Sequence, residues 1–225
     1  MSHQKRTSST RRAPLARKGT TFISCQSPGP HRKAESMPLN VVVRDILSLV
    51  ETGREVKKSL NAGLILVNGV AIKDHKFPIG FLDELTFTIS KDKFIVVYNT
   101  LGKLELKKQE KDYPKAMKVI GKKTLPKGKT QVNLHTGKNI LLDKTKEFKV
   151  GDSIIVEKNK VVKHMKFEKG AKVFLTSGKH VGHNGIIEEI KKNESWSQPK
   201  KILVKTKEGI FETSRECAYV VDGEL

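Results

Sequence analysis

The 225-residue chain has few cysteines, few aromatic residues and no long apolar segment. Cys25 and Cys217 are the only cysteines, and without a C-x-x-C motif they exclude a disulfide framework and a four-cysteine zinc site. No apolar run reaches the roughly 18 to 20 residues of a membrane-spanning helix, and the charged N-terminal region lacks the apolar stretch of a secretory signal. We therefore expect a soluble, intracellular, cytoplasmic protein with no membrane association.

Motifs for metal, nucleotide or covalent chemistry are also missing from the sequence. Gly128-Lys129-Thr130 is similar to the end of a phosphate-binding loop, but that motif needs a glycine at position 123, which is lysine. His180, His183 and Cys217 would supply only three zinc ligands. No nucleophile is paired with a candidate base. The sequence thus predicts no enzyme activity, no cofactor, no metal site and no small-molecule substrate.

The chain carries a large excess of positive charge. It has 44 Lys and Arg against 24 Asp and Glu, which gives a net charge of +20. Residues 1–37 hold 8 basic and 1 acidic side chains, residues 38–90 hold 6 of each, residues 91–168 hold 20 and 9, and residues 169–225 hold 10 and 8. Such an excess is typical of proteins that bind a polyanion, above all nucleic acid.

Residues 1–37 form a basic N-terminal arm. Prolines and glycines interrupt any sustained helix, and too few apolar residues are present to offset the entropy of folding alone. We predict an extended arm that gains structure when it follows RNA phosphates. A mitochondrial transit peptide is the alternative, but the same prolines and glycines would interrupt its amphipathic helix. The candidate RNA contacts in the arm are Arg6, Arg11, Arg12, Arg17, Lys18, Arg32 and Lys33.

Residues 38–90 begin with the pattern of two helices. Apolar residues between positions 42 and 50 recur at helical spacing and predict the first helix. A second helix, residues 54–61, would bury Val56 and Leu60 and end at Gly63.

A β-hairpin is predicted directly after these helices. Asn68-Gly69 lies between apolar runs at residues 64–67 and 70–72, and both residues of this dipeptide tolerate the positive φ of a tight turn. A further strand at residues 85–89 would complete the sheet.

The segment R-E-V-K-K-S-L-N-A-G-L-I-L-V-N-G-V, residues 54–70, resembles the signature of the S-four type RNA-binding domain. In that family the basic face of the second helix and the hairpin tip hold structured RNA. An ordinary solvated helix face is the alternative for Lys57 and Lys58, because this segment has no net charge. The resemblance implies RNA contacts at Arg54, Lys57, Lys58, Asn61, Asn68 and Lys73, with Arg44 of the first helix added.

Residues 91–168 are predicted to form a strand-rich unit with a basic surface. A hairpin at residues 94–108 opens it, and another turns at Thr136-Gly137. Strands of about five residues recur every 8–12 residues, which is typical of a small β-barrel.

Residues 169–225 contain a glycine-rich loop between two predicted strands, residues 173–176 and 186–190. Gly178, Gly182 and Gly185 in this loop indicate positive φ or close backbone approach. The pattern resembles the KOW motif of ribosomal proteins and transcription elongation factors, which forms part of an SH3-like barrel. The resemblance implies RNA contacts at Lys179, His180 and His183.

The predicted fold is α+β and multi-module. A basic extended arm (1–37) precedes a two-helix and hairpin RNA-binding domain (38–90) and two small β-barrel-like units, a central strand-rich one (91–168) and an SH3-like one with the KOW motif (169–225). This order resembles the S-four-e family of archaeal and eukaryotic small-subunit ribosomal proteins over essentially the full chain. Segments that support the resemblance include S-P-G-P-H at 27–31, K-F-P-I-G at 76–80 and F-E-K-G at 167–170.

The family resemblance implies a structural constituent of the small ribosomal subunit that binds and organises small-subunit rRNA in translation. Its partners would be this rRNA and other small-subunit ribosomal proteins. Two other classes stay open. A KOW-containing transcription or translation-associated factor would explain only the last segment. An RNA-modifying enzyme with an S-four type domain would need a large catalytic domain, for which the Lys-rich short strands after residue 90 are a poor host.

Overall fold

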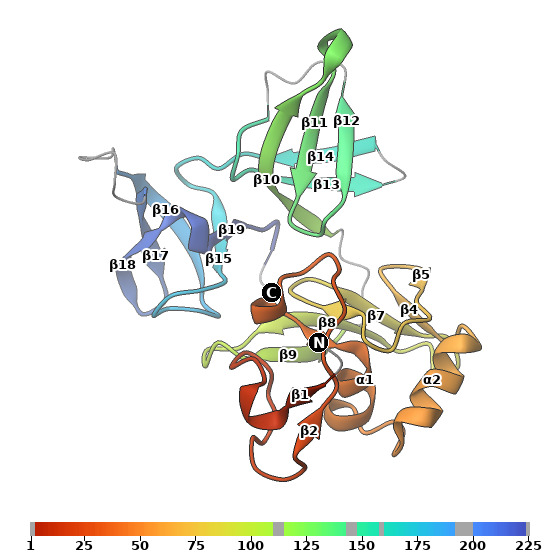
Figure 1. Ribbon diagram of the computed structural model, residues 1–225. Helices are drawn as coiled ribbons and strands as arrows, with labels where there is room; N and C mark the ends of the chain where they lie inside the picture. Colours follow the sequence, from red (N-terminus) through yellow and green to blue (C-terminus); the bar gives the residue numbers. More distant parts are fainter. Residues whose placement is uncertain (1–2, 110–114, 143–147, 158–159, 192–199, 224–225) are drawn as a thin grey trace. The chain divides into compact units, whose positions relative to one another are not determined.

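The computed structural model describes residues 3–109, 115–142, 148–157, 160–191 and 200–223 (Figure 1). The chain divides into two compact units, Met1–Tyr98 with Lys103–Asp112, and Asn99–Gly102 with Tyr113–Leu225. Few helices and many antiparallel strands in several sheets make this an α+β, β-rich protein. No helix among the described residues is long and apolar enough to cross a membrane.

The first helix of the first unit is short. α1 (Leu39–Val41) continues directly as a π-helical turn, Val42–Ile46. Ser48 then adopts a left-handed φ of 51°, which a right-handed helix cannot continue. The predicted helix through residue 50 is therefore wrong at its C-terminal end, and Leu49 is 55% exposed.

The second helix agrees with its prediction. α2 (Gly53–Asn61) buries Val56 and Leu60 completely, as their spacing on one helical face requires. Gly63 has a φ of 71°, and its N–H donates to the carbonyl oxygen of Leu60, which confirms its role at the helix C-terminus.

A five-stranded antiparallel sheet completes the first unit, in the order β5-β4-β7-β8-β9. The predicted hairpin turns at Asn68-Gly69, where φ is 52° and 77°. The strands are β4 (Ile65–Val67), β5 (Val70–Ala71), β7 (Glu84–Phe87), β8 (Lys93–Tyr98) and β9 (Leu104–Lys108).

The hairpin β8–β9 corrects the predicted boundary at residue 90. It exists as expected, but β8 pairs with β7 through Glu84 and Ile95 and so belongs to the sheet of the first unit. The apolar side chains of Val96 and Val97 are buried in that unit. Alternation of apolar residues identified the hairpin but carried no information about its partner strand.

The N-terminal segment folds against the first unit instead of staying extended, which corrects a second expectation. Ile23 and Cys25 are buried, and the N–H of Ser27 donates to the carbonyl oxygen of Lys76 at 2.9 Å. The arm thus has backbone partners that its composition did not reveal. Its strands are β1 (Gln4–Lys5), paired with β2 (Phe22–Ile23), and β3 (Met37–Pro38), paired with β6 (Pro78–Ile79); single 3-10 turns lie at Arg6–Ser8 and Lys33–Glu35.

The second unit contains two five-stranded antiparallel sheets. In the first, ordered β12-β11-β10-β13-β14, the long strand β10 pairs with β13 near its start and with β11 from Val119 onward. Val119, Val132 and Ile154 lie at the centre of its core. The elements are β10 (Ala116–Thr124), a 3-10 turn (Pro126–Gly128), β11 (Thr130–Leu134), β12 (Asn139–Leu142), β13 (Ser153–Glu157) and β14 (Lys160–Met165).

The second sheet of this unit has the order β18-β17-β16-β15-β19. Val173, Ile187 and Val204 are buried in its own apolar core. The predicted pair of strands around the glycine loop is confirmed as β15 and β16. The elements are β15 (Lys172–Leu175), β16 (Asn184–Ile190), β17 (Lys201–Thr206), β18 (Gly209–Ser214), a 3-10 turn (Arg215–Cys217) and β19 (Ala218–Val220).

Candidate nucleic-acid interface

One face of α2 gathers four of the predicted RNA-binding residues. Val56 and Leu60 fix the orientation of the helix by packing into the core, so residues spaced three and four apart on the opposite side share an outward face. The four residues on this face, all exposed, are Arg54, Lys57, Lys58 and Asn61.

The N-terminus of α2 is held by a capping box. Thr52 Oγ1 accepts a hydrogen bond from the N–H of Glu55 at 3.3 Å, and Glu55 Oε2 accepts one from the N–H of Thr52 at 3.4 Å. The pKa of Glu55 is lowered, most by the interaction of its carboxylate with the Thr52 hydroxyl and then by the N–H groups of Thr52 and Glu51. The capping box therefore fixes the first turn of α2, which carries the exposed side chain of Arg54.

A hollow of about 490 Å³ opens at this end of α2. The pKa of His75, at its wall, is lowered chiefly by burial and then by the charge of Lys57, with Asp74 acting in the opposite direction. Two of the predicted RNA-binding residues, Arg54 and Lys57, line this hollow. The residues lining the hollow are Ser24, Asn40, Thr52, Gly53, Arg54, Lys57 and His75.

Two residues predicted near the hairpin and the first helix have partners within the protein. Asn68 Nδ2 donates to Asp83 Oδ1 at 2.8 Å. Arg44 donates through Nε and Nη2 to the two carboxylate oxygens of Asp45, both at 2.9 Å, and this interaction raises its pKa. Lys73, by contrast, is exposed.

The arginines of the N-terminal segment differ in the same way. Arg12 Nη1 donates to the hydroxyl of Tyr98 at 2.6 Å, and its guanidinium lies 4.8 Å from the centre of that ring. Arg6 donates through Nε to the carbonyl oxygen of Ala16 at 2.6 Å and through Nη1 to Thr20 Oγ1. These two arginines shape the segment itself. The exposed members of the predicted set are Arg11, Arg17, Lys18, Arg32 and Lys33.

A buried contact between a histidine and an aspartate joins the N-terminal segment to the rest of the first unit. His31 Nε2 lies 2.7 Å from Asp83 Oδ2, and the two side chains are 7% and 1% exposed. Gly80 allows this approach, because a Cβ at its position would lie 2.5 Å from the His31 ring. The segments S-P-G-P-H and K-F-P-I-G therefore contact each other in the fold.

The glycine loop of the second unit presents the remaining candidates. Gly178 and Gly182 have φ of 94° and 83°, and a Cβ on Gly185 would lie 2.4 Å from Val204, so each glycine is needed as predicted. Lys179 on this loop is exposed, as the prediction of an RNA contact requires.

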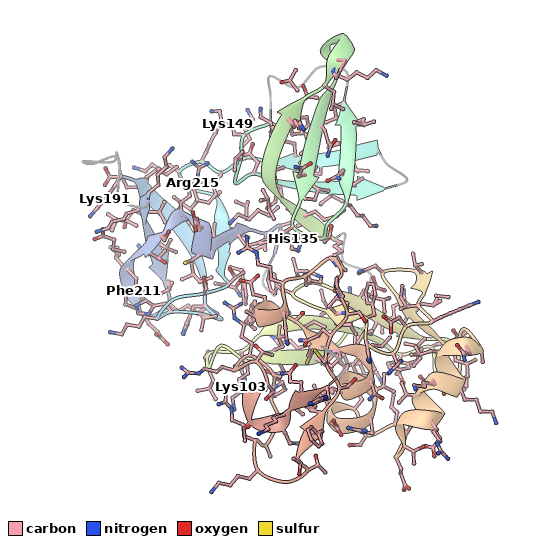
Figure 2. All side chains as sticks on the ribbon, in the orientation of Figure 1. Lys103, His135, Lys149, Lys191, Phe211 and Arg215 are labelled. Carbon is pink, nitrogen blue, oxygen red and sulfur yellow. The ribbon has the colours of Figure 1, made fainter. Side chains whose placement is uncertain are left out.

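The two histidines of the loop have protein neighbours. The ring of His180 stacks on that of Phe211, which is labelled in Figure 2, with centroids 3.7 Å apart and planes inclined by 18°. His183 Nδ1 lies 3.8 Å from Glu208 Oε1. The sequence analysis did not identify Phe211 as a neighbour of the loop. In the alternating pattern of β18 it has no feature that distinguishes it from other strand residues. Among the described residues, no group of three or more His, Cys, Asp or Glu could hold a metal ion.

Known proteins resemble the chain over nearly its whole length. A model of ribosomal family S4e matches residues 90–161. The small ribosomal subunit protein eS4 of Methanosphaera stadtmanae is 39% identical over 97% of this chain and 91% of that protein, and that of Archaeoglobus fulgidus is 38% identical over 97% and 92%. The crystal structure of the 30S ribosomal protein S4e from Thermoplasma acidophilum matches with a TM-score of 0.70 and 31% identity, over 83% of this chain and 95% of that one.

Exposed lysines and arginines on small β-rich units are typical of the class of nucleic-acid-binding proteins. The comparisons are more specific than this class. The chain belongs to ribosomal family S4e, the family of small ribosomal subunit protein eS4. The family resemblance predicted from the order of modules is thereby confirmed, and with it a structural role in the small ribosomal subunit and in translation.

Proposed function

We propose that this protein binds and organises small-subunit rRNA as a non-enzymatic constituent of the cytoplasmic ribosome, next to other small-subunit proteins. The observation that carries the proposal is the basic face of α2, where four residues implied by the S-four type resemblance lie together and exposed. Phosphate contacts from such a face position a protein on RNA without requiring a particular base.

The finer division of labour follows the predicted modules. The S-four type domain would hold structured RNA with α2, and the N-terminal segment would follow the backbone with its exposed arginines and lysines. The strand-rich middle would contribute lysines, and the KOW-type loop of the SH3-like unit would reach RNA with Lys179. His180 and His183 would act from a loop whose position Phe211 stabilises by stacking.

Binding of rRNA should be electrostatic and fall steeply with salt, because each neutralised phosphate releases counterions. Affinity for a small-subunit rRNA fragment is measured across a salt series for the wild type and for the triple variant Arg54→Ala, Lys57→Ala, Lys58→Ala. Alanine keeps helix propensity, so the fold is retained. We expect the triple variant to lower the slope of log K against log salt by about 2 to 3.

Equal slopes and identical rRNA footprints for both proteins would show that the α2 face is only solvated surface. A second measurement separates a ribosomal constituent from a factor. The constituent stays with the small subunit through a high-salt wash, whereas a transcription or translation-associated factor comes off.

A further inference from the structure

Phe22 of the N-terminal segment exposes a large aromatic ring to solvent. Its side chain is 56% exposed, whereas every other Phe, Tyr and Trp among the described residues is buried or partly buried. Burial of an aromatic ring is one of the larger single gains in folding, and Phe22 does not obtain it within the chain. A single exposed apolar side chain is common on protein surfaces, so the surroundings of this ring decide what it can bind.

Strand pairing directs the ring outward. β1 and β2 lie side by side in Figure 1, and their register places Gln4 opposite Ile23 and Lys5 opposite Phe22. Directly opposite side chains share a face of the sheet, and successive side chains along a strand alternate between the faces. Gln4 and Ile23 are buried, so Lys5 and Phe22 share the outer face. The register of this small sheet therefore fixes the exposure of the ring.

The ring is also held in its orientation by neighbours. The rings of His3 and Phe22 lie edge to face, with centroids 5.4 Å apart and planes inclined by 85°. The N–H of Arg6 donates to the carbonyl oxygen of Thr21 at 2.9 Å, and the hydroxyl of Thr20 donates to that of Phe22 at 3.4 Å. A ring that is positioned before binding loses less conformational entropy when a partner stacks on it.

The charged side chains around the ring are all positive. Lys5 is exposed directly beside it. The side-chain hydrogen bonds of Arg6 close the loop between β1 and β2, on which Arg17 and Lys18 are exposed. Residues 3–34 include no Asp or Glu, so this surface complements the charge of an RNA backbone. An exposed aromatic ring among lysines and arginines is the arrangement on which unpaired nucleobases stack.

We propose that Phe22 is a stacking surface for one unpaired nucleobase of small-subunit rRNA, with Lys5 placed to contact a neighbouring phosphate. The inference rests on the proposed function and extends it. The RNA contacts named so far are polar or charged side chains, and neither Phe22 nor Lys5 is among them. A stacking surface selects an unpaired nucleotide, whereas phosphate contacts alone do not distinguish single strands from duplexes.

The main test is Phe22→Leu, which keeps an apolar side chain and removes the aromatic face. Affinity for a small-subunit rRNA fragment should fall about 10-fold, with no change in the slope of log K against log salt, because no charge is lost. Phe22→Trp should retain the affinity, since tryptophan also stacks on nucleobases. Lys5→Ala should instead lower the slope by about 1.

The matched control is Ile89→Ala, which truncates another exposed apolar side chain of the first unit. Ile89 is 78% exposed. This variant should bind the rRNA fragment with the affinity of the wild type. Resistance of the N-terminal segment to trypsin, equal to that of the wild type, verifies that each variant is folded.

A measurement on the wild type detects stacking without any substitution in the protein that binds. In the full chain with ¹³C-labelled phenylalanine rings, the signals of Phe22 are identified by their loss in Phe22→Leu. They are followed on titration with a single-stranded rRNA fragment, with the same fragment annealed to its complement, and with inorganic polyphosphate. A nucleobase stacked on the ring shifts its proton signals upfield, and we expect this shift with the single strand only.

Two results would overturn the stacking surface and leave the proposed function standing. One is normal affinity of Phe22→Leu for the rRNA fragment, and the other is the same shift of the ring signals with all three ligands. If Phe22→Leu binds rRNA normally but enters small subunits slowly, the ring contacts another protein, which also overturns the proposal. Absence of rRNA binding by the wild type would instead overturn the proposed function.

Discussion

Both units of the molecule contain a buried aspartate paired with a histidine, but the two aspartates connect different things. In the first unit, Asp83 accepts hydrogen bonds from the N–H of Gly80 and from Asn68 Nδ2, and lies beside His31. Its three neighbours come from the N-terminal segment, the hairpin turn and the strand region after it. One carboxylate thus joins three separate parts of the first unit.

In the second unit, the partners of Asp152 lie close to it in the sequence. It accepts hydrogen bonds from the N–H groups of Lys149 and Phe167 at 2.9 and 3.0 Å, and His164 Nε2 lies 2.8 Å from its Oδ2. All three partners lie within the segment around β13 and β14. The same local chemistry thus holds a distant segment in one unit and closes a local turn in the other.

Removal of the long-range aspartate should have the largest effect. Asp83→Ala leaves His31 and Asn68 without their shared acceptor, and each polar group left unsatisfied costs about 1–3 kcal/mol, or about 3–5 kcal/mol together. The free energy of unfolding of the first unit, measured by hydrogen exchange in the full chain, should fall by this amount. Trypsin should also cleave the N-terminal segment after Arg32 or Lys33 more readily.

The variant His31→Ala sharpens this result, because Asp83 keeps its other two partners. It should release the N-terminal segment at a smaller cost in stability. If Asp83→Ala destabilises the unit but leaves the segment as resistant to trypsin as before, the buried pair is not what holds the segment.

The reach of these contacts also explains what could be predicted from the sequence. The helix α2, the Asn68-Gly69 turn and the glycine loop follow from neighbours in the chain, and all three exist as expected. The partner of β8 and the folding of the arm depend on residues far away in the sequence. Apolar spacing carries no information about such distant partners. The predicted boundary at residue 90 and the predicted extended arm were therefore both wrong.

The candidate site divides in the same manner. The exposed face of α2 was predictable because helical periodicity alone places its four residues together. The engagement of Asn68 by Asp83 was not, since a turn residue and a distant carboxylate share no pattern. Asn40, which lines the hollow at the N-terminus of α2, interrupts the apolar run P-L-N-V-V-V. This single polar residue was the signal in the sequence that could have drawn attention to the hollow.

The second unit should respond to acid through Asp152. Burial raises the pKa of this carboxyl group, but the hydrogen bonds from Phe167, Lys149 and His164 outweigh burial and lower it below 3.8. A lowered pKa stabilises the folded state above the ordinary value of 3.8, and this stability is lost as the pH falls through the folded pKa.

The variant Asp152→Asn removes the charge at nearly constant size. It should lower the free energy of unfolding of the second unit by about 2 kcal/mol at neutral pH and flatten the acid dependence below about pH 4. Hydrogen exchange in the full chain checks both, with the first unit as an internal reference. An acid profile of the second unit that is the same in the variant and the wild type would contradict this role.

The smallest effects are expected at ion pairs that solvent reaches, and one pair from each unit serves as an example. Arg44 pairs with Asp45 in the first unit, at side chains that are 29% and 20% exposed. Lys163 Nζ lies 2.6 Å from Asp222 in the second unit, at side chains that are about half exposed. Solvent screens such pairs, so Arg44→Ala and Lys163→Ala should each change the free energy of unfolding by less than about 0.5 kcal/mol. Denaturant melts of the two variants measure this.

The same Arg44 variant tests which bases of the first unit meet RNA. Two donors of Arg44, Nε and Nη2, are directed at Asp45, whereas Lys57 is exposed at the hollow. Arg44→Ala should therefore weaken rRNA binding less than Lys57→Ala does. The reverse order would mean that Asp45 gives up the guanidinium when RNA binds, because a phosphate accepts from arginine in the same two-pronged geometry as a carboxylate.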